Sequence, residues 1–314
     1  MKVTACAGND DIAMVYIAQT DTGKQIEFVE SVQPPMPREK KWVIIVSTLF
    51  GCPVRCPICD AGSFYQGKLT KDEIFAQIDF LVKKRFPDSK IVVDKFKIQF
   101  ARLGEPAFNP AVLEVIEELP SRYNAPGLMP CISTIAPASA AIFFSRLIDI
   151  KKNLYRNRFQ LQFSIHTTEE RLRDRLIPAS KWNFTQIAAY GERFFDTGGR
   201  KIALNFALAR KSPLDPDTLS RYFDPEVFLI KITPINPTYS AFKNGFVSLI
   251  DSNNHSDNNK LIQRLRDRGY DVILSIGELE ENQIGSNCGQ YIAGYLNEKT
   301  RIKDGYSYVL HDQI

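Results

Sequence analysis

The hydrophobic and polar residues of this chain first predict a β-hairpin. Residues 13–19 and 25–32 are two runs rich in apolar and β-branched residues that partly alternate with polar ones, as in half-buried strands. Between them stands the sequence TDTGK at 20–24, whose polar residues and glycine are typical of a turn. The prolines and basic residues at 34–41 then indicate a short connector.

From residue 42 onward the pattern changes to strands that alternate with helices. Residues 42–48, WVIIVST, form a nearly continuous apolar run, as expected of a strand buried on both faces. Thr70 and Glu73 have the spacing of a capping box, so a helix begins there. Further strands are predicted at 96–101, 128–133, 160–165, 202–207, 228–233 and 271–275. Helices are predicted between them at 110–119, 138–150, 183–195, 214–222 and 259–268.

Repeated strand–helix units imply an α/β fold with a parallel sheet and right-handed crossovers. The strands that begin at residue 42 favour an open or partial barrel over a doubly wound sheet, although strand number alone does not distinguish them. In such folds the functional residues lie at the C-terminal ends of the strands. We expect a hairpin extension at 1–40, a partial (β/α)6-type barrel at 41–275 and a C-terminal segment at 276–314.

Composition fits a globular enzyme. Hydrophobic residues make up 44% of the chain and charged residues 24%, which are ordinary values. The net charge of +4 permits an anionic partner without requiring one. Because the sequence has no apolar run of membrane-spanning length and no apolar signal core at its start, we expect a cytoplasmic protein with no membrane partner.

The strongest chemical signal is the loop GCPVRCPICD at 51–60. Cys52, Cys56 and Cys59 can hold three irons of a cuboidal 4Fe–4S cluster and leave the fourth iron open for a cofactor. A zinc knuckle would need a fourth ligand at short range, and the histidines stand far away, at 166, 255 and 311. A disulfide framework is disfavoured because six cysteines are few for 314 residues.

Small and polar residues also follow the other predicted strands. They are, in chain order, Gly104, Glu105, Ser133, Ser164, His166 and Asn236. A glycine lets the backbone approach a ligand closely, and a carboxylate accepts hydrogen bonds from an ammonium group. Each residue alone is equally typical of a loop, a helix cap or a half-buried histidine. Their shared position at strand ends favours one binding site.

The motifs together resemble a known family. The cysteine spacing is similar to that of the radical S-adenosylmethionine (SAM) superfamily. The ordered set GCPVRCPICD, LGEPAFNP, IST, FSIHTTEERLRDRLIP, TPINP and SNCGQYIAG resembles the Cfr/RlmN branch, over about residues 23–294. That branch consists of methyltransferases that modify an adenine of large-subunit ribosomal RNA at carbon 2 or carbon 8.

The resemblance implies two cofactors. A 4Fe–4S cluster would be bound by Cys52, Cys56 and Cys59, and one electron from it would cleave SAM to a 5′-deoxyadenosyl radical. The SAM contacts would come from Gly104, Glu105, Ser133, Ser164, His166 and Asn236. The resemblance further implies a reductant such as flavodoxin or ferredoxin and an RNA partner.

The resemblance also implies two catalytic residues. Cys288, in SNCGQYIAG, corresponds to the methyl-carrying cysteine: its thiolate would take a methyl from one SAM, and the radical formed on that methyl would add to an sp² carbon. Glu27, in IEFV at 26–29, corresponds to a proton acceptor.

The chain departs from the family at three places. Ile45 stands where the family has a second cysteine that releases the product, and the buried-type Cys131 is the spare thiol nearest to a strand end. Arg102 and Leu103 replace a glycine and a methionine. The short sequence before residue 42 predicts that the small RNA-engaging domain is missing.

Basic residues give only a thin nucleic-acid signal. They cluster at Lys151, Lys152, Arg156 and Arg158, and again at Arg264, Arg266 and Arg268. Clusters of this size can bind phosphates, but they also occur by chance on a surface of this charge. Two alternatives therefore remain open: a radical SAM enzyme with a small-molecule or peptide substrate, and a non-catalytic protein with a structural metal site.

Overall fold

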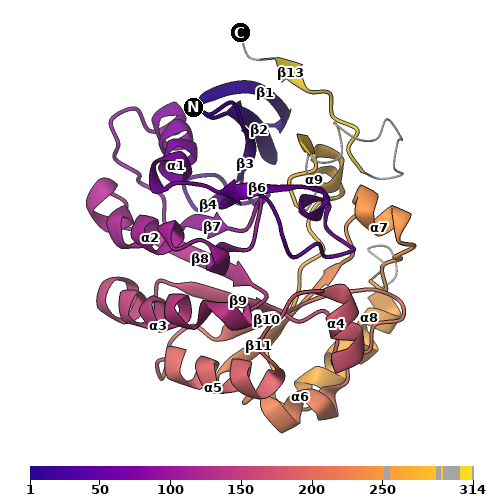
Figure 1. Cartoon of the computed structure of the whole chain (residues 1–314). Helices are drawn as coiled ribbons and strands as arrows, with labels where there is room; N and C mark the ends of the chain where they lie inside the picture. Colours follow the sequence, from indigo (N-terminus) through magenta and orange to yellow (C-terminus); the bar gives the residue numbers. More distant parts are fainter. Residues whose placement is uncertain (251–254, 288–290, 293–304, 313–314) are drawn as a thin grey trace.

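Seven parallel strands form the centre of the fold (Figure 1). The computed structural model describes residues 1–250, 255–287, 291–292 and 305–312. The seven strands are β4 (Trp42–Val46), β7 (Phe96–Phe100), β8 (Leu128–Thr134), β9 (Gln160–Ser164), β10 (Ile202–Leu208), β11 (Phe228–Pro234) and β12 (Val272–Leu274). They follow one another in the sheet in chain order, and each neighbouring pair is parallel. The α/β class and the parallel sheet are confirmed.

The N-terminal strands extend the same sheet on the other side of β4. They are β1 (Lys2–Asn9), β2 (Ala13–Gln19) and β3 (Gln25–Ser31), and a short strand, β13 (His311–Asp312), pairs with β1. The β2–β3 hairpin confirms the prediction, and β3 continues into β4 by antiparallel pairing of Val29 with Ile45. β1 was not predicted, because its sequence KVTACAGN has few large apolar side chains. The boundary expected near residue 40 stays a prediction.

In the view of Figure 1 the helices surround the parallel strands on the left, below and on the right. They include α1 (Lys71–Arg85), α2 (Ala111–Arg122), α3 (Ala141–Ile150), α5 (Phe184–Phe194), α6 (Pro216–Tyr222) and α8 (His255–Arg266). α1 begins with the predicted capping box: Thr70 and Glu73 exchange side-chain-to-backbone hydrogen bonds, which satisfies the first free N–H groups of the helix. Shorter helices that were not predicted are α4 (Glu170–Leu176), α7 (Tyr239–Lys243) and α9 (Leu279–Ile284).

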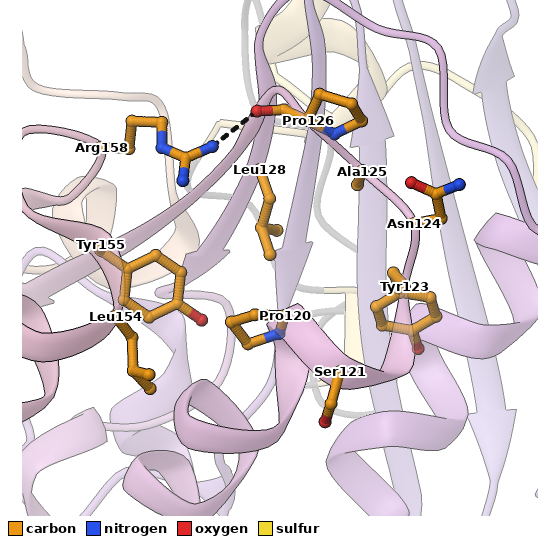
Figure 2. A pocket seen from close by; sticks show the side chains of 10 residues that line it. All are labelled: Pro120, Ser121, Tyr123, Asn124, Ala125, Pro126, Leu128, Leu154, Tyr155 and Arg158. Carbon is orange, nitrogen blue, oxygen red and sulfur yellow. Dashed lines mark hydrogen bonds between the residues drawn. The ribbon is translucent and has the colours of Figure 1, made fainter.

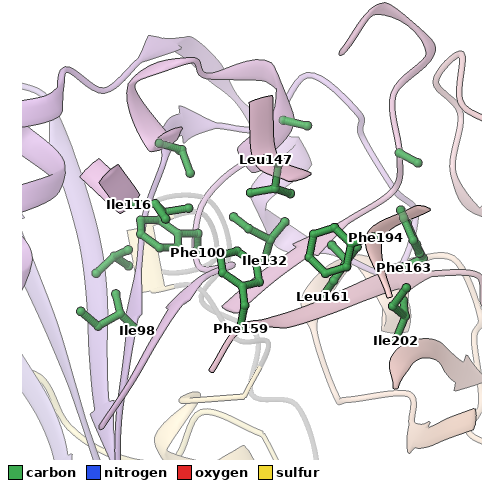
Figure 3. Close-up of a cluster of buried hydrophobic side chains, with 14 of the residues drawn as sticks. Ile98, Phe100, Ile116, Ile132, Leu147, Phe159, Leu161, Phe163, Phe194 and Ile202 are labelled. Atoms are coloured by element: carbon green, nitrogen blue, oxygen red, sulfur yellow. The ribbon is translucent and has the colours of Figure 1, made fainter. Parts of the chain in front are cut away.

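The two faces of the sheet differ in chemistry. Along β7, Phe96, Ile98 and Phe100 are fully buried in the core that the helices cover, and Figure 3 shows Ile98 and Phe100 beside Ile116 of α2. Because side chains alternate along a strand, Lys97 and Gln99 point to the opposite face, which we call the inner face. The side chains of β7 that face away from the helices are therefore polar. Within the described ranges, no helix is long and apolar enough to span a bilayer.

Candidate functional site

The three-cysteine loop is enclosed by a small two-stranded sheet. Strands β5 (Leu49–Gly51) and β6 (Tyr65–Lys68) pair antiparallel, and the N–H of Cys52 donates to the carbonyl of Phe64 at 3.0 Å. Gly51 has φ +79°, and a Cβ there would lie 2.0 Å from the Phe64 carbonyl oxygen. Only glycine fits where residue 51 contacts the Phe64 backbone. The two ends of the loop meet there, and Cys52, Cys56 and Cys59 lie between them.

The cysteine side chains sit in a setting that suits bound metal. Backbone N–H groups of Val54 and Arg55 favour the thiolate of Cys52, and Arg55 has φ +58°. Successive N–H groups in such a turn make an anion-binding concavity of the kind found at iron–sulfur sites. Burial nevertheless raises the pKa of Cys52 to about 11 and that of Cys56 to about 12. Thiols buried in this way need a bound cation to become thiolates.

The three cysteines border two apolar clusters. Cys52 and Cys59 border one apolar cluster, which includes Ala61 and Leu103, and Cys52 and Cys56 border a second. Among the residues that the structure describes, no group of three or more His, Cys, Asp or Glu side chains is placed to hold a metal ion. A cuboidal cluster makes a different demand from a single ion, because each thiolate binds its own iron.

The Gly104–Glu105 turn lies directly against this loop. Gly104 has φ +97°, and a Cβ there would lie 2.5 Å from the Leu49 side chain; the backbone N–H of Glu105 favours the Cys52 thiolate. The Glu105 carboxylate is 4% exposed. It accepts hydrogen bonds from Thr134 Oγ1 at 2.5 Å and from the N–H groups of Ile135 and Ala107 at 2.9 and 3.1 Å.

Most hydrogen-bond acceptor positions of the Glu105 carboxylate are therefore occupied by groups of the protein itself. Burial raises its pKa to about 7, and its three donors oppose that shift. A carboxylate offers about four acceptor positions, so about one remains for a ligand. The predicted contact of Glu105 with an ammonium group stays a prediction.

The remaining predicted SAM contacts do lie at the C-terminal ends of neighbouring strands. Ser133 on β8 accepts a hydrogen bond from Gln162 on β9 at 3.3 Å, Ser164 ends β9 beside Asn205, and Asn236 follows β11. The loop after β11 also touches the cysteine loop, because Thr238 Oγ1 donates to the Ile58 carbonyl at 3.0 Å. The structure thus brings these positions to one edge of the sheet.

His166 is held as a neutral, strained residue. It has φ +65°, and the N–H of Ala207 donates to its Nδ1 at 3.1 Å, which leaves the ring proton on Nε2. Burial, with a contribution from the charge of Arg173, lowers the pKa of His166 to about 4. At neutral pH its imidazole therefore carries no charge.

This depressed pKa predicts a loss of stability in acid. The unfolded chain takes up a proton at His166 near pH 6.5, while the folded chain resists protonation down to about pH 4. Acidification between these values should therefore cost about 3 kcal/mol of unfolding free energy at this residue. The H166N variant should lack this part of the pH dependence, since asparagine tolerates positive φ and its carbonyl can accept the Ala207 N–H. Urea unfolding at several pH values checks this; equal pH slopes in the two proteins would contradict it.

Sequence reasoning missed an anchor of the cysteine loop, Asp60. Its carboxylate accepts hydrogen bonds from the N–H groups of Tyr239 and Ser240 at 3.2 and 2.7 Å, and from Tyr306 Oη at 3.0 Å. These donors are remote in sequence, so only the position of Asp60 at the end of the cysteine motif could have signalled a role. Its contacts fix the loop to the start of α7 and to the C-terminal part of the chain.

Of the two predicted catalytic residues, Cys288 and Glu27, the structure describes Glu27. Cys288 lies outside the described residues. Glu27 is fully buried in β3, and its Oε1 lies 2.8 Å from Arg102 Nη2. Burial raises the pKa of Glu27, whereas Arg102 and the N–H groups of Ile292 and Tyr291 oppose that shift. The proton-acceptor role of Glu27 stays a prediction.

No family model matches the chain. The "Probable dual-specificity RNA methyltransferase RlmN" of Mycolicibacterium gilvum (strain PYR-GCK) is 25% identical over 266 residues, which are 80% of this chain and 67% of that protein. Its counterpart from Mycobacterium ulcerans (strain Agy99) is 25% identical over 283 residues, 84% and 71% of the two chains.

A solved structure shares the fold. The radical SAM methyltransferase from Sphaerobacter thermophilus superposes with a TM-score of 0.70 at 20% identity, over 92% of this chain and 81% of that one. The chain is a divergent relative of the RlmN-type radical SAM methyltransferases. The relationship confirms the resemblance that the motifs indicated and the expectation of an enzyme.

One departure from the RlmN pattern is visible in the structure. Ile45, in place of a cysteine, packs in the apolar cluster that also contains Val29, Tyr291 and Ile292 and that borders Cys52. Cys131 lies two strands away at the same level, because Ile45 pairs with Gln99 and Gln99 with Cys131. The Cys131 thiol is buried, which raises its pKa, and it points its hydrogen toward the Met129 carbonyl at 3.6 Å.

A separate pocket lies away from this RlmN-like site. It has a volume of about 400 Å³ and lies between the end of α2 and the turn Lys151–Tyr155 (η4), with Tyr123, Leu128 and Arg158 among its lining residues (Figure 2). Leu128 begins β8, so the pocket opens at the N-terminal ends of the strands, opposite the cysteine loop. It is not part of the candidate site.

The basic clusters are partly used by the fold. Lys151 is 4% exposed; it pairs with Asp196 and donates to the Phe194 carbonyl. Arg158 donates to the Pro126 carbonyl at 2.8 Å, and Arg268 pairs with Asp217. The cluster around residue 151 therefore offers fewer charges to a phosphate backbone than its sequence suggests.

Proposed function

We propose that this protein is a radical SAM methyltransferase of RlmN type that binds a 4Fe–4S cluster and SAM and methylates an sp² carbon of RNA. One observation carries the proposal: Cys52, Cys56 and Cys59 share one loop at the C-terminal edge of a parallel sheet, with N–H groups directed at the Cys52 sulfur. The relatives named RlmN support the reaction type and the RNA substrate. A small electron carrier such as flavodoxin or ferredoxin would deliver the electron.

In this proposal the chain's own groups bind and orient. Cys52, Cys56 and Cys59 would hold the cluster, and the N–H groups around Cys52 would stabilise its negative charge. The turn at Gly104, which packs on Leu49, would bring the backbone close to SAM. Ser133, Ser164, His166 and Asn236 would contact SAM, with the His166 ring held neutral by burial. When bound, the cluster and SAM together supply a carbon-centred radical that removes a hydrogen atom.

Cys288 would carry the methyl group. Its thiolate would attack the methyl carbon of SAM and displace S-adenosylhomocysteine, which requires a deprotonated sulfur. Loss of one hydrogen atom from this methyl would leave a carbon radical able to add to an sp² carbon. Simple displacement cannot methylate an sp² carbon of this kind, because the carbon has no lone pair with which to attack the methyl group.

Cations gather on the inner face toward the N-terminal ends of β4 and β7, away from the cysteine loop. Lys97 of β7 and Lys231 of β11 lie on this face, opposite the apolar residues of their strands. Burial lowers the pKa of Lys41 to about 8, and the charges of Lys97, Lys95 and Lys231 add to the effect. Cations that repel one another in this way attract an anion, such as a nucleic-acid phosphate.

A second candidate is a radical SAM enzyme with a non-RNA substrate. Ile45 favours it, because isoleucine can neither take a proton from the adduct nor form the disulfide that releases the product. Cys131 could replace the missing thiol only as a thiolate, and its burial favours the protonated form. Such an enzyme would still bind the cluster and SAM, but Cys288 would not carry a methyl group.

Peptide mass spectrometry of the Cys288 segment tests the proposal. After anaerobic reconstitution of the cluster and incubation with SAM, we expect a methyl group on Cys288, with S-adenosylhomocysteine and 5′-deoxyadenosine both formed. The C288S variant is the matched control and should remain unmethylated. An unmodified Cys288 beside an intact cluster and continued 5′-deoxyadenosine formation would favour the second candidate. If the protein bound neither iron nor sulfide, this result would favour the alternative of a non-catalytic protein with a structural metal site.

A further inference from the structure

The pair formed by Arg102 and Glu27 is the most deeply buried ion pair of the described residues. The two side chains are 2% and 0% exposed, and Arg102 Nη2 lies 2.8 Å from Glu27 Oε1. Glu27 belongs to β3, and Arg102 stands two residues after the end of β7. Transfer of charges from water to such a place is costly unless their hydrogen-bonding groups find further partners.

Those further partners come from the C-terminal part of the chain. Arg102 Nη1 donates to the carbonyl of Ser286 at 3.1 Å. The N–H of Ile292 donates to Glu27 Oε2 at 3.1 Å, and the N–H of Tyr291 is a second backbone donor to this carboxylate. The pair thus holds the chain on both sides of residues 287–290, a stretch that includes Cys288 by sequence.

Apolar packing reinforces this attachment. Tyr291 and Ile292 are buried with Leu103, the neighbour of Arg102, in the cluster that borders Cys52 and Cys59. Tyr291 Oη also donates to the Ile284 carbonyl at 2.6 Å. The anchored part of the chain therefore docks beside the cysteine loop.

The same contacts speak against a proton-accepting Glu27. Arginine keeps its charge at every physiological pH. If Glu27 took up a proton, the buried guanidinium of Arg102 would lose its counter-charge, which is strongly unfavourable. Arg102 is also one of the two residues by which the chain departs from the family at this loop, and its counter-charge is Glu27.

We propose that Arg102 and Glu27 are positioning residues that fix Ser286 and Ile292 beside the cysteine loop. Glu27 acts as a fixed acceptor of backbone N–H groups and does not take a proton in the reaction. The role assigned to Cys288 rests on the proposed function; the anchoring of Ser286 and Ile292 does not.

Two neutral double variants test this. E27L/R102M removes both charges and both anchors, whereas E27Q/R102M removes both charges but keeps an amide oxygen for the Ile292 N–H. Replacing both partners of a buried pair avoids an uncompensated charge and preserves folding. If E27L/R102M still fails to fold, E27Q/R102M compared with wild type carries the test.

The first readout is hydrogen exchange of the peptide that contains Ile292, which needs neither cluster nor SAM. We expect exchange at Ile292 to accelerate by about tenfold or more in E27L/R102M and to remain close to wild type in E27Q/R102M, because only the latter keeps the hydrogen bond. Unchanged exchange in E27L/R102M would overturn the anchoring.

The second readout is the ratio of Cys288 methylation to iron content after reconstitution. We expect this ratio to fall about tenfold in E27L/R102M, while E27Q/R102M keeps most of it and both variants bind iron as wild type. Equal loss in the two variants would show that the hydrogen bond from Ile292 to residue 27 does not position the segment, and would overturn the assignment of Glu27 as a fixed acceptor. Absence of methylation in wild type would refute the proposed function and leave the exchange result standing.

Discussion

The C56A variant should lose the cluster and with it all formation of 5′-deoxyadenosine. Cys56 is one of only three thiols in the loop, and its pKa of about 12 means that iron binding must supply the energy to deprotonate it. Removing it leaves two protein ligands for a cluster that needs three. After anaerobic reconstitution we expect wild type to hold about four irons and four sulfides per chain, and C56A to hold little of either.

A second cysteine provides the matched control. Cys131 is also buried, but it lies in β8 with its thiol directed at the Met129 carbonyl, outside the cysteine loop. The C131A variant should therefore keep the iron and sulfide content of wild type. A full cluster in C56A, or an equal loss in C131A, would refute the assignment of the loop as the cluster site.

The largest effect on stability is expected from E30M, far from the cysteine loop. Glu30 in β3 is 2% exposed and accepts hydrogen bonds from Arg85, Tyr16 and Trp42, the last at 3.2 Å. Although burial raises the pKa of Glu30, the hydrogen bonds from Arg85 and Tyr16 lower it below its usual value. Methionine fills a similar volume but leaves these donors without an acceptor. Because breaking a buried pair costs about 3–5 kcal/mol, urea unfolding should show a loss of that size.

An exposed ion pair is the control for this variant. Asp94 pairs with Lys40 at 2.8 Å, and both side chains are more than half exposed. Water and salt screen such a pair, so D94A should leave the unfolding midpoint almost unchanged. A loss in D94A as large as that in E30M would mean that burial does not control the strength of these pairs.

Some features of the site can be recognised in the sequence, and others cannot. The cysteine motif and the capping box are local: their residues stand within ten positions of one another, and the sequence alone was enough to predict the loop and the start of α1. Asp60 and Arg102 were not recognised as contributors to the site. Their partners are Tyr306 and Glu27, which lie up to 246 residues away, and no spacing rule connects such positions.

The sequence by itself determined the parallel strands of this protein, the main helices between them and their order. Apolar runs specified the parallel strands, because strands buried on one face against helices must be apolar there, and the glycines and cysteines after β4 specified the three-cysteine loop. Only the tertiary structure decided which distant residues pack beside that loop. A buried carboxylate or guanidinium is tolerated only where the fold supplies a counter-charge and donors. The meeting of Glu27 with Arg102, and of both with Ser286 and Ile292, is therefore a property of the folded chain and cannot be read from either residue alone.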